Sequence, residues 1–299
     1  MSDYVIKQYE KGFEILHREI DSEITKDWVW PFEGFTDIYE SSDFDPESVL
    51  SCFKGKKMVG YIASKFMAEG PAINKIEGMG VYMDIPRVLP GNEEVADLLM
   101  EKLLEVVKTK GAKFIRTRAN TMRKNSIPIV KKWKFTPLPD FNLGYKIYYT
   151  YDLRKGKLDI PTDDLQEFVL ERDLEDCAKG PARHFKLPIK NTMKWITETD
   201  MRDDLVSHYV IREKNELVGY CNALPNPHDK DIIATYYIEA KNEHYMKQLI
   251  VQTVNNCIDK NHRIFLIDLI GYLLPYKELV ESLNFENTCS WVIYEKRIA

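Results

Sequence analysis

The sequence has few cysteines and lacks any long apolar run. Its five cysteines are odd in number, widely spaced and without a CxxC pair, so neither a disulfide framework nor a zinc knuckle is expected. No stretch approaches the roughly 18 apolar residues of a membrane-spanning helix. The first residues lack the apolar core of a signal peptide. These absences predict a cytoplasmic protein with reduced thiols and no membrane partner.

A strong excess of charge of one sign is also missing. The 42 Lys and Arg residues against 47 Asp and Glu residues give a net charge of −5, which argues against broad nucleic-acid binding. The six histidines show no HxH or HExxH spacing, so we expect no metal site. What is present is the composition of a folded protein, 44% hydrophobic and 30% charged. At 299 residues, two domains are the natural expectation.

An internal repeat supports two domains. Residues 92–135 align without a gap with residues 242–285, at an offset of 150 positions. Identities are few, but hydrophobic positions agree, as at Met100 and Ile250. The offset changes to 159 before this block and to 146 after it, as expected when length differences lie in loops. The pattern indicates an old structural duplication.

Both halves predict the same order of elements from hydrophobic periodicity and turn residues. In the first half we expect strands at 4–9, 75–83 and 113–118, a hairpin over 48–66, a closing pair within 134–153, and helices before 46, at 93–112 and at 126–133. In the second half we expect a hairpin over 209–224, strands at 231–240, 263–270 and 290–297, and helices at 242–260 and 275–283.

This succession predicts an α/β fold with a mixed (α+β) sheet in each half. The boundary is expected where charge, glycine and proline concentrate. We therefore predict domains over residues 1–152 and 161–299, joined by a linker at 153–160.

The order of elements resembles the GNAT N-acetyltransferase superfamily, here as a tandem pair covering nearly the whole chain. The segments that carry the resemblance are the apolar stretch at 76–81, the helix-opening loop at 91–96, and Asn125 followed by residues 130–135. The resemblance implies two acyl-CoA N-acyltransferase-like domains. It also implies acetyl-CoA or another acyl-CoA as cosubstrate, and a small-molecule or peptide amine as acceptor.

The family loop binds the CoA pyrophosphate through backbone N–H groups at the start of the long helix. In this sequence Glu94 replaces the first glycine of the family loop, and Ala96 occupies the second position, where the family has glycine or alanine. The strand before the loop would hold the pantetheine by strand-like hydrogen bonds. The candidate cofactor-binding residues implied by the resemblance are Val81, Tyr82, Met83, Gly91, Asn92, Val95, Ala96 and Asn125.

Loop length favours the first half as the site of the cofactor. Fifteen positions separate Val81 from Ala96, but only eight separate the residues aligned with them, Ile238 and Met246. Acyl transfer also needs a base to collect the proton of the amine and an acid for the departing thiolate. The resemblance suggests Glu77 as the base, with Tyr145 or Tyr148 reaching the site as acid.

Other interpretations stay open. The missing glycines and tyrosines also suit a non-catalytic GNAT-like module that binds a ligand or a protein. Cys177 and His184 allow a weaker third hypothesis, a thiol hydrolase. Arg118 and Arg123 belong to a basic cluster that suits either a CoA phosphate, an acidic substrate, or a solvated strand end.

Overall fold

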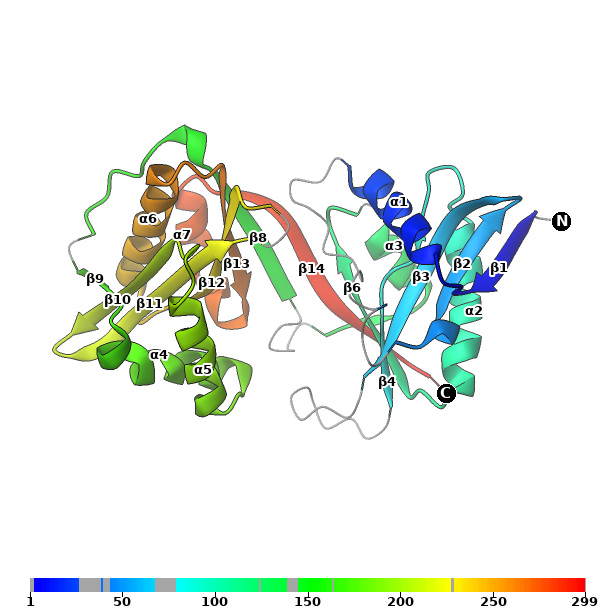
Figure 1. The fold of residues 1–299 in the computed structure, drawn as a ribbon, viewed down its shortest axis with the longest axis horizontal. Helices are drawn as coiled ribbons and strands as arrows, with labels where there is room; N and C mark the ends of the chain where they lie inside the picture. Colours follow the sequence, from blue (N-terminus) through cyan, green and yellow to red (C-terminus); the bar gives the residue numbers. More distant parts are fainter. Residues whose placement is uncertain are drawn as a thin grey trace. The chain divides into compact units, whose positions relative to one another are not determined.

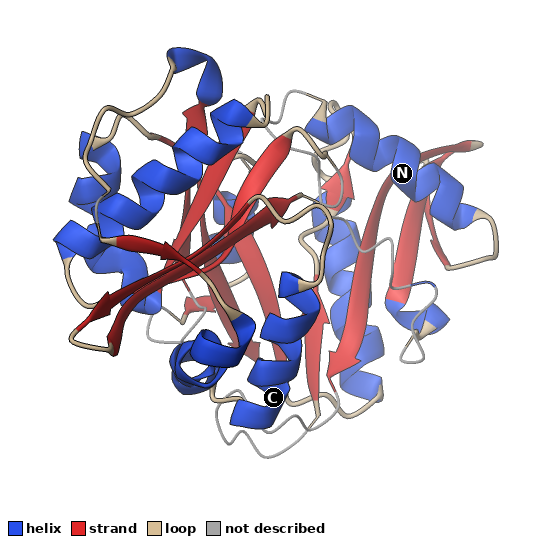
Figure 2. Ribbon diagram, turned by 60° about the vertical axis from the view of Figure 1, so that its left-hand side comes forward, coloured by secondary structure: helices blue, strands red, loops and turns tan. Residues whose placement is uncertain are grey.

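The computed structural model describes residues 3–26, 39, 44–67, 79–123, 125–138, 145–162, 164–226 and 229–298. The chain forms two compact units: unit 1 contains Met1–Gly144 and Trp291–Ala299, and unit 2 contains Tyr145–Ser290. Each unit is a twisted sheet flanked by helices (Figures 1 and 2). The predicted mixed sheet in each half is confirmed.

Unit 1 is built on strands in the order β1-β2-β3-β4-β6-β14. The β4–β6 pair is parallel, and the other neighbouring pairs are antiparallel. Its elements are β1 (Tyr4–Gln8), α1 (Phe13–Thr25), a 3-10 turn (Pro46–Ser48), β2 (Val49–Lys54), β3 (Lys57–Met67), β4 (Gly80–Met83), β5 (Arg87–Val88), α2 (Val95–Thr109), β6 (Phe114–Asn120), α3 (Ser126–Lys132), β7 (Thr136–Pro137) and the second part of β14 (Glu286–Arg297).

Unit 2 repeats this plan with strands in the order β8-β13-β12-β11-β10-β9. Here β12 and β13 are the parallel pair. Its elements are β8 (Tyr145–Asp152), a 3-10 turn (Leu153–Lys155), β9 (Leu165–Glu167), α4 (Leu170–Phe185), α5 (Ile189–Asp200), β10 (Ser207–Glu213), β11 (Glu216–Pro225), β12 (Ile232–Ala240), α6 (Glu243–Asp259), β13 (Ile264–Ile270), η4 (Gly271–Tyr276) and α7 (Lys277–Ser282).

The internal repeat is confirmed by how the two long helices end. Gly111 follows α2 with φ of 83°, and Asn261, at the repeat offset, follows α6 with φ of 59°. In both places the next N–H bonds back five residues, from Ala112 to Val107 and from His262 to Cys257, at 3.0 Å. Glycine and asparagine tolerate the left-handed backbone that this C-terminal cap requires.

Each long helix covers one face of its sheet through a regular apolar stripe. In α2 the stripe consists of Val95, Leu99, Leu103 and Val107, all fully buried. The spacing of four residues keeps them on one side of the helix. In unit 2, α6 forms the corresponding core against β11, β12 and β13. Smaller clusters lie under α1 in unit 1, and under α4 and α5 in unit 2.

The closing strand of each unit comes from the opposite half of the sequence. Strand β8 pairs with β13 in unit 2, and Trp291 to Arg297 of β14 pairs with β6 in unit 1. The strand expected to close the first half therefore belongs to unit 2. This division differs from the sequence-based one at residues 153–160, because pairing of distant strands leaves no local signal in the sequence.

Candidate functional site

The two parallel strands at the centre of each sheet are paired over only three residues. In unit 1 the β4–β6 pairing ends at Tyr82 and Arg116, although β6 continues to Asn120. In unit 2 the β12–β13 pairing ends at Ala234 and Leu266. Beyond these points the two parallel strands are no longer hydrogen-bonded to each other. We call the place where they part, after Tyr82 and Arg116 in unit 1 and after Ala234 and Leu266 in unit 2, the wedge of each unit.

One strand beside each wedge contains a bulge at the same place. In unit 1, Met83 lies opposite Ser64 and Arg87 opposite Tyr61. The three residues 84–86 therefore lie opposite only two residues of β3, 62 and 63. In unit 2, the register with β11 shifts between Thr235 and Tyr237. An extra residue re-aims the following backbone and side chains, so both strands change direction where the wedge begins.

The bulges give a better alignment of the halves than the sequence did. Leu89 N–H donates to Val59 O at 2.9 Å, and Lys241 N–H donates to Val218 O at 2.8 Å. Val59 and Val218 are repeat-equivalent, so Leu89 corresponds to Lys241. The aligned segments are therefore 83–89 and 235–241.

The equivalence of Val81 with Ile238 assumed from the sequence is wrong. Ten positions separate Leu89 from Leu99, and eight separate Lys241 from Leu249. The two loops before the long helices thus differ by two residues rather than seven, and loop length alone does not favour unit 1.

Two tyrosines of η4 occupy the wedge of unit 2. The Tyr272 hydroxyl donates to Ile238 O at 3.2 Å, and the Tyr276 hydroxyl donates to Ala240 O at 2.8 Å. Burial raises the pKa of both hydroxyls, so both remain protonated donors at neutral pH. The edge of β12 that would bind an extended ligand therefore already accepts hydrogen bonds from these two tyrosines.

An arginine takes the equivalent place in unit 1. The Arg123 guanidinium donates to Ile85 O at 2.9 Å and also to Pro86 O, and Pro86 corresponds to Ile238. Within the described part of the chain, Arg123 forms no ion pair with a carboxylate. Burial, together with the nearby Arg87 guanidinium, lowers the pKa of Arg123 to about 10. Its hydrogen bonds hold a positive charge at the wedge.

The loop that opens α2 carries carboxylates where the resemblance implies an anion site. Gly91 has φ of 80°, and its N–H donates to Glu93 Oε1 at 2.9 Å. The Tyr4 hydroxyl donates to Glu94 Oε1 at 2.7 Å, which raises the pKa of Tyr4 to about 12. The amide of Val95 is bonded to Asn92 O at 2.9 Å. This loop fits an incoming phosphate poorly.

The other predicted site residues are dispersed. Val81 and Met83 are buried in the core under α2, and Val95 and Ala96 are buried in the first turn of α2, whereas Asn125 is exposed at the start of α3. Glu77 lies outside the described residues.

Tyr145 and Tyr148 belong to unit 2, on β8, where Tyr148 lies opposite Asp268 of β13. They therefore do not come from the same unit as the predicted cofactor residues. Of the predicted cofactor residues, Val81, Met83 and Val95 share one buried cluster.

An ion pair ties the bulged strand of unit 1 to the first helix. Arg87 is 2% exposed, and its Nη1 lies 3.0 Å from Asp21 Oδ1 on α1. The same guanidinium binds Asp84, which precedes the bulge. The Tyr61 hydroxyl donates to Asp21 at 2.7 Å. Burial raises the pKa of Asp21, although Arg87 opposes that shift.

Unit 2 has the same link with the charges reversed. Glu239, the counterpart of Arg87, binds Arg183 of α4 and lies 3.1 Å from His184 Nε2. The Tyr237 hydroxyl donates to Glu239 at 2.6 Å. A Cβ at Gly180 would lie 2.2 Å from Glu239 Oε2, so a larger residue at this position would require the Glu239 carboxylate to move. The residues border a pocket of about 470 Å³ between α4, β11 and β12.

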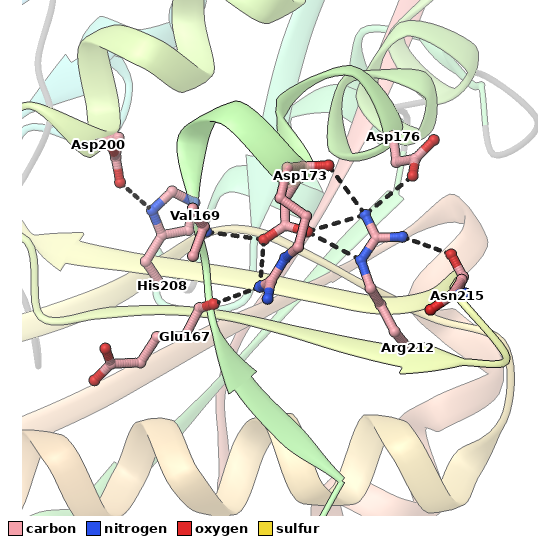
Figure 3. A network of polar contacts seen from close by, with 9 residues as sticks. Glu167, Val169, Asp173, Asp176, Asp200, His208, Arg212 and Asn215 are labelled. Atoms are coloured by element: carbon pink, nitrogen blue, oxygen red, sulfur yellow. Dashed lines mark hydrogen bonds and ion pairs between the residues drawn. The ribbon is translucent and has the colours of Figure 1, made fainter.

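A second polar network fixes the start of α4 (Figure 3). The Asp173 carboxylate is fully buried and accepts hydrogen bonds from the Val169 N–H at 2.8 Å and from the guanidinium groups of Arg172 and Arg212. Burial alone would raise the pKa of Asp173, but these hydrogen bonds hold it below its ordinary value. Nearby, His208 Nδ1 lies 2.9 Å from Asp200 Oδ1. These contacts position α4 and α5 over the sheet.

The thiol hydrolase hypothesis is not supported by the geometry. Cys177 is 1% exposed, and burial raises the pKa of its thiol far above neutrality. His184 binds Glu239 and Arg183 instead. A buried neutral thiol is not a nucleophile. All five cysteines are free and buried.

Solved structures share this architecture over nearly the whole chain. A GCN5-related N-acetyltransferase from Sphaerobacter thermophilus matches with a TM-score of 0.65 at 10% identity, covering 99% of this chain and 96% of that one. A tandem GNAT protein from the clavulanic acid biosynthesis pathway matches with a TM-score of 0.64 at 11% identity, covering 98% of each. N-myristoyltransferase from Saccharomyces cerevisiae matches with a TM-score of 0.52 at 12% identity, covering 99% and 80%.

At these identities the similarity establishes the fold alone. Scans against protein-family models and against curated proteins give no match. Among the described residues, no helix is both long and apolar enough to cross a membrane. The described His, Cys, Asp and Glu side chains also include no group of three or more arranged to hold a metal ion.

Proposed function

Because the chain has the GNAT fold in tandem over its whole length, we propose that it transfers an acetyl or other acyl group from CoA to an amine, in unit 1. The observation that carries this proposal is the bulged strand β4–β5 beside the wedge. Its carbonyls at Ile85 and Pro86 are held by one flexible side chain, Arg123. An entering ligand needs to displace only that side chain.

Unit 2 does not fit the cofactor. Two half-buried tyrosines donate their hydroxyl hydrogens to the carbonyls of Ile238 and Ala240, and removing them from the wedge would require repacking η4. A buried polar group that loses its partner costs roughly 1–3 kcal/mol. We therefore assign one cofactor site per chain.

The residues of unit 1 fit a pantetheine arm better than a pyrophosphate. Arg87 and Val88 pair with β3 on one side, and the carbonyls of Ile85 and Pro86 accept hydrogen bonds from a side chain rather than from a neighbouring strand. Glu93 and Glu94 oppose an anion, each by about 1 kcal/mol at 4 Å in water. When bound, acyl-CoA supplies the thioester.

This chain would supply a base for the amine proton, and we propose Glu77 for that role. No acid role is assigned to Tyr145 or Tyr148, since β8 belongs to unit 2. The predicted cofactor residues Val81, Tyr82, Met83, Gly91, Asn92, Val95, Ala96 and Asn125 would support the strand and the loop around the cofactor.

Calorimetric titration of the whole protein with acetyl-CoA tests the proposal. We expect one site per chain and weak binding, tightened several-fold by Glu94→Gln because a repelling carboxylate is removed. The double change Tyr272→Phe and Tyr276→Phe, in unit 2, should leave this site unchanged.

Glu77→Gln should abolish acetyl transfer to amines between about pH 6 and 9 without weakening acetyl-CoA binding. Transfer that persists in Glu77→Gln would remove the base assignment.

A non-catalytic ligand- or protein-binding module is the second candidate. It is favoured because side chains of the protein, Arg123 in unit 1 and Tyr272 in unit 2, already bind the strand carbonyls at both wedges. The carboxylates at the start of α2 also favour it, since they oppose a phosphate. This candidate predicts no heat at millimolar acetyl-CoA or CoA. That result would replace the acyltransferase proposal.

A further inference from the structure

Arg118, at the edge of the unit 1 wedge, is held in place by aromatic rings and not by an ion pair with a described carboxylate. Strand β6 continues past the last pair with β4, and Arg118 is its first side chain beyond that point on the face that carries Arg116. The side chain is exposed, whereas its strand neighbours Thr117 and Ala119 are buried. It therefore lies where a ligand entering the wedge from this face would pass.

Two aromatic rings hold the guanidinium of Arg118. Its Cζ lies 4.4 Å from the centre of the Trp291 ring and 5.4 Å from that of Tyr82. Ring faces attract a guanidinium and restrict its rotation. They leave the N–H groups along its edge unbonded, because no hydrogen bond from Arg118 to another described residue is present. A planar, oriented fork of donors matches a carboxylate in bidentate geometry.

The nearby acids are already used by other cations. Glu295 binds Arg116 at 2.9 Å and Arg297 at 2.9 Å, and Asp84 binds Arg87. In the described residues of this face, Arg118 is thus left without an acidic partner. A fixed guanidinium loses little side-chain entropy on binding an anion.

We propose that Arg118 binds a carboxylate carried by the amine acceptor, so that the acceptor class is an amine with a free acid group. This inference rests on the proposed function, since it names the acceptor of that reaction. A phosphate of CoA is the other possible source of an anion. Arg118 shares its face with Tyr82, opposite the α2 side where Val81 and Met83 are buried, and this favours the acceptor.

Matched pairs of amino acids and their carboxamides, such as glycine and glycinamide, test the inference with acetyl-CoA as donor. In the wild type we expect kcat/KM for the acid to exceed that for the amide at least tenfold for one or more pairs. Arg118→Gln should reduce the preference to below about twofold and leave the KM for acetyl-CoA unchanged. Arg297→Gln is the control, since this exposed arginine pairs with Glu295 and should preserve the preference.

Where no amine is acetylated, thermal unfolding with the same pairs at 10 mM decides the question. The acid should raise the Tm of the wild type more than the amide does, and Arg118→Gln should erase that difference. Equal responses to acid and amide in the wild type, including no response to either, would overturn the inference. So would an Arg118→Gln variant that weakens acetyl-CoA and keeps the acid preference. Absence of acetyl-CoA binding in calorimetry would instead remove the proposed function.

Discussion

The carbonyl oxygens of Pro86 and Ile238, equivalent in the two halves, each accept a hydrogen bond from a side chain of a segment that follows the second parallel strand. In unit 1 the donor is Arg123, and in unit 2 it is Tyr272. The difference matters chemically because a ligand entering unit 1 would have to displace one arginine side chain, whereas in unit 2 it would have to displace two tyrosines of η4. At the residue scale, this contrast is the reason for placing the cofactor in unit 1.

His17 gives a pH-dependent prediction at the same scale. It is 1% exposed, stacks on Tyr61 at 4.0 Å, and its Nε2 lies 2.8 Å from Ser51 Oγ. Burial lowers the pKa of His17 to about 4 from 6.5. The folded state therefore favours the neutral ring. Stability from this group is fully present above pH 6.5 and is lost as the pH falls toward 4.

The expected loss is of order 3 kcal/mol, at about 1.4 kcal/mol per pKa unit. Urea unfolding between pH 7 and pH 4.5 measures it. His17→Gln should flatten the pH dependence relative to the wild type, whereas His244→Gln, at an exposed site, should not. Parallel curves for the wild type and His17→Gln would show that His17 carries no such linkage.

At the scale of elements, the Asp173 network ties the first turn of α4 to the β10–β11 hairpin. Arg212 reaches from β10 to Asp173 at 2.9 Å and to Asp176 at 3.0 Å, and also donates to the carbonyl of Asn215 at the hairpin turn. The turn itself uses left-handed Lys214 and Asn215, as its sequence predicts. The network therefore connects two elements that the chain brings together only on folding.

Replacing Asp173 with Asn should destabilise the protein by about 3 kcal/mol, because two guanidinium groups lose a buried anionic partner. Denaturant unfolding at pH 7 measures the change. Asp204→Asn serves as the control, since its pair with Arg202 is largely exposed and should contribute less than about 1 kcal/mol. Equal effects of the two substitutions would contradict a special role for the buried network.

At the scale of the whole molecule, the exchange of closing strands sets which fragments fold. A fragment of residues 145–290 keeps β8 beside β13, whereas residues 153–299 leave the edge of β13 unpaired. An unpaired strand edge next to a core is unstable and prone to associate. We expect the first fragment to be monomeric and cooperatively folded, and the second to be unfolded or aggregated.

Circular dichroism, size-exclusion chromatography and urea unfolding of both fragments test this expectation. Residues 1–152 should fail for the same reason, since β6 would lack residues 291–297. The addition of a peptide of residues 286–298 is the matched rescue. A stable, monomeric 153–299 fragment would show that β8 is not required for unit 2.

Much of this architecture could be predicted from the sequence. The stripe from Val95 to Val107 defines α2, the hydrophobic pattern of residues 242–260 predicts α6, and the turn residues within 209–224 predict the β10–β11 hairpin. These features depend on residues close in sequence, whose side-chain period and turn chemistry are local. The mixed sheet followed from the order of these elements, the tandem GNAT fold was implied by the resemblance to that superfamily, and both are confirmed.

Tertiary structure alone decided the rest. Pairing of β14 with β6 joins residues about 180 positions apart, and its hydrophobic pattern is the same whichever unit it closes. The bulges at residues 84–86 and 236 change which residues of the two halves are equivalent, and the amino-acid pattern does not reveal this change. The occupants of the wedges, Arg123 and Tyr272, likewise depend on where a loop folds back in space. The sequence alone determined the local elements because their causes are local, whereas the site depends on contacts between distant segments.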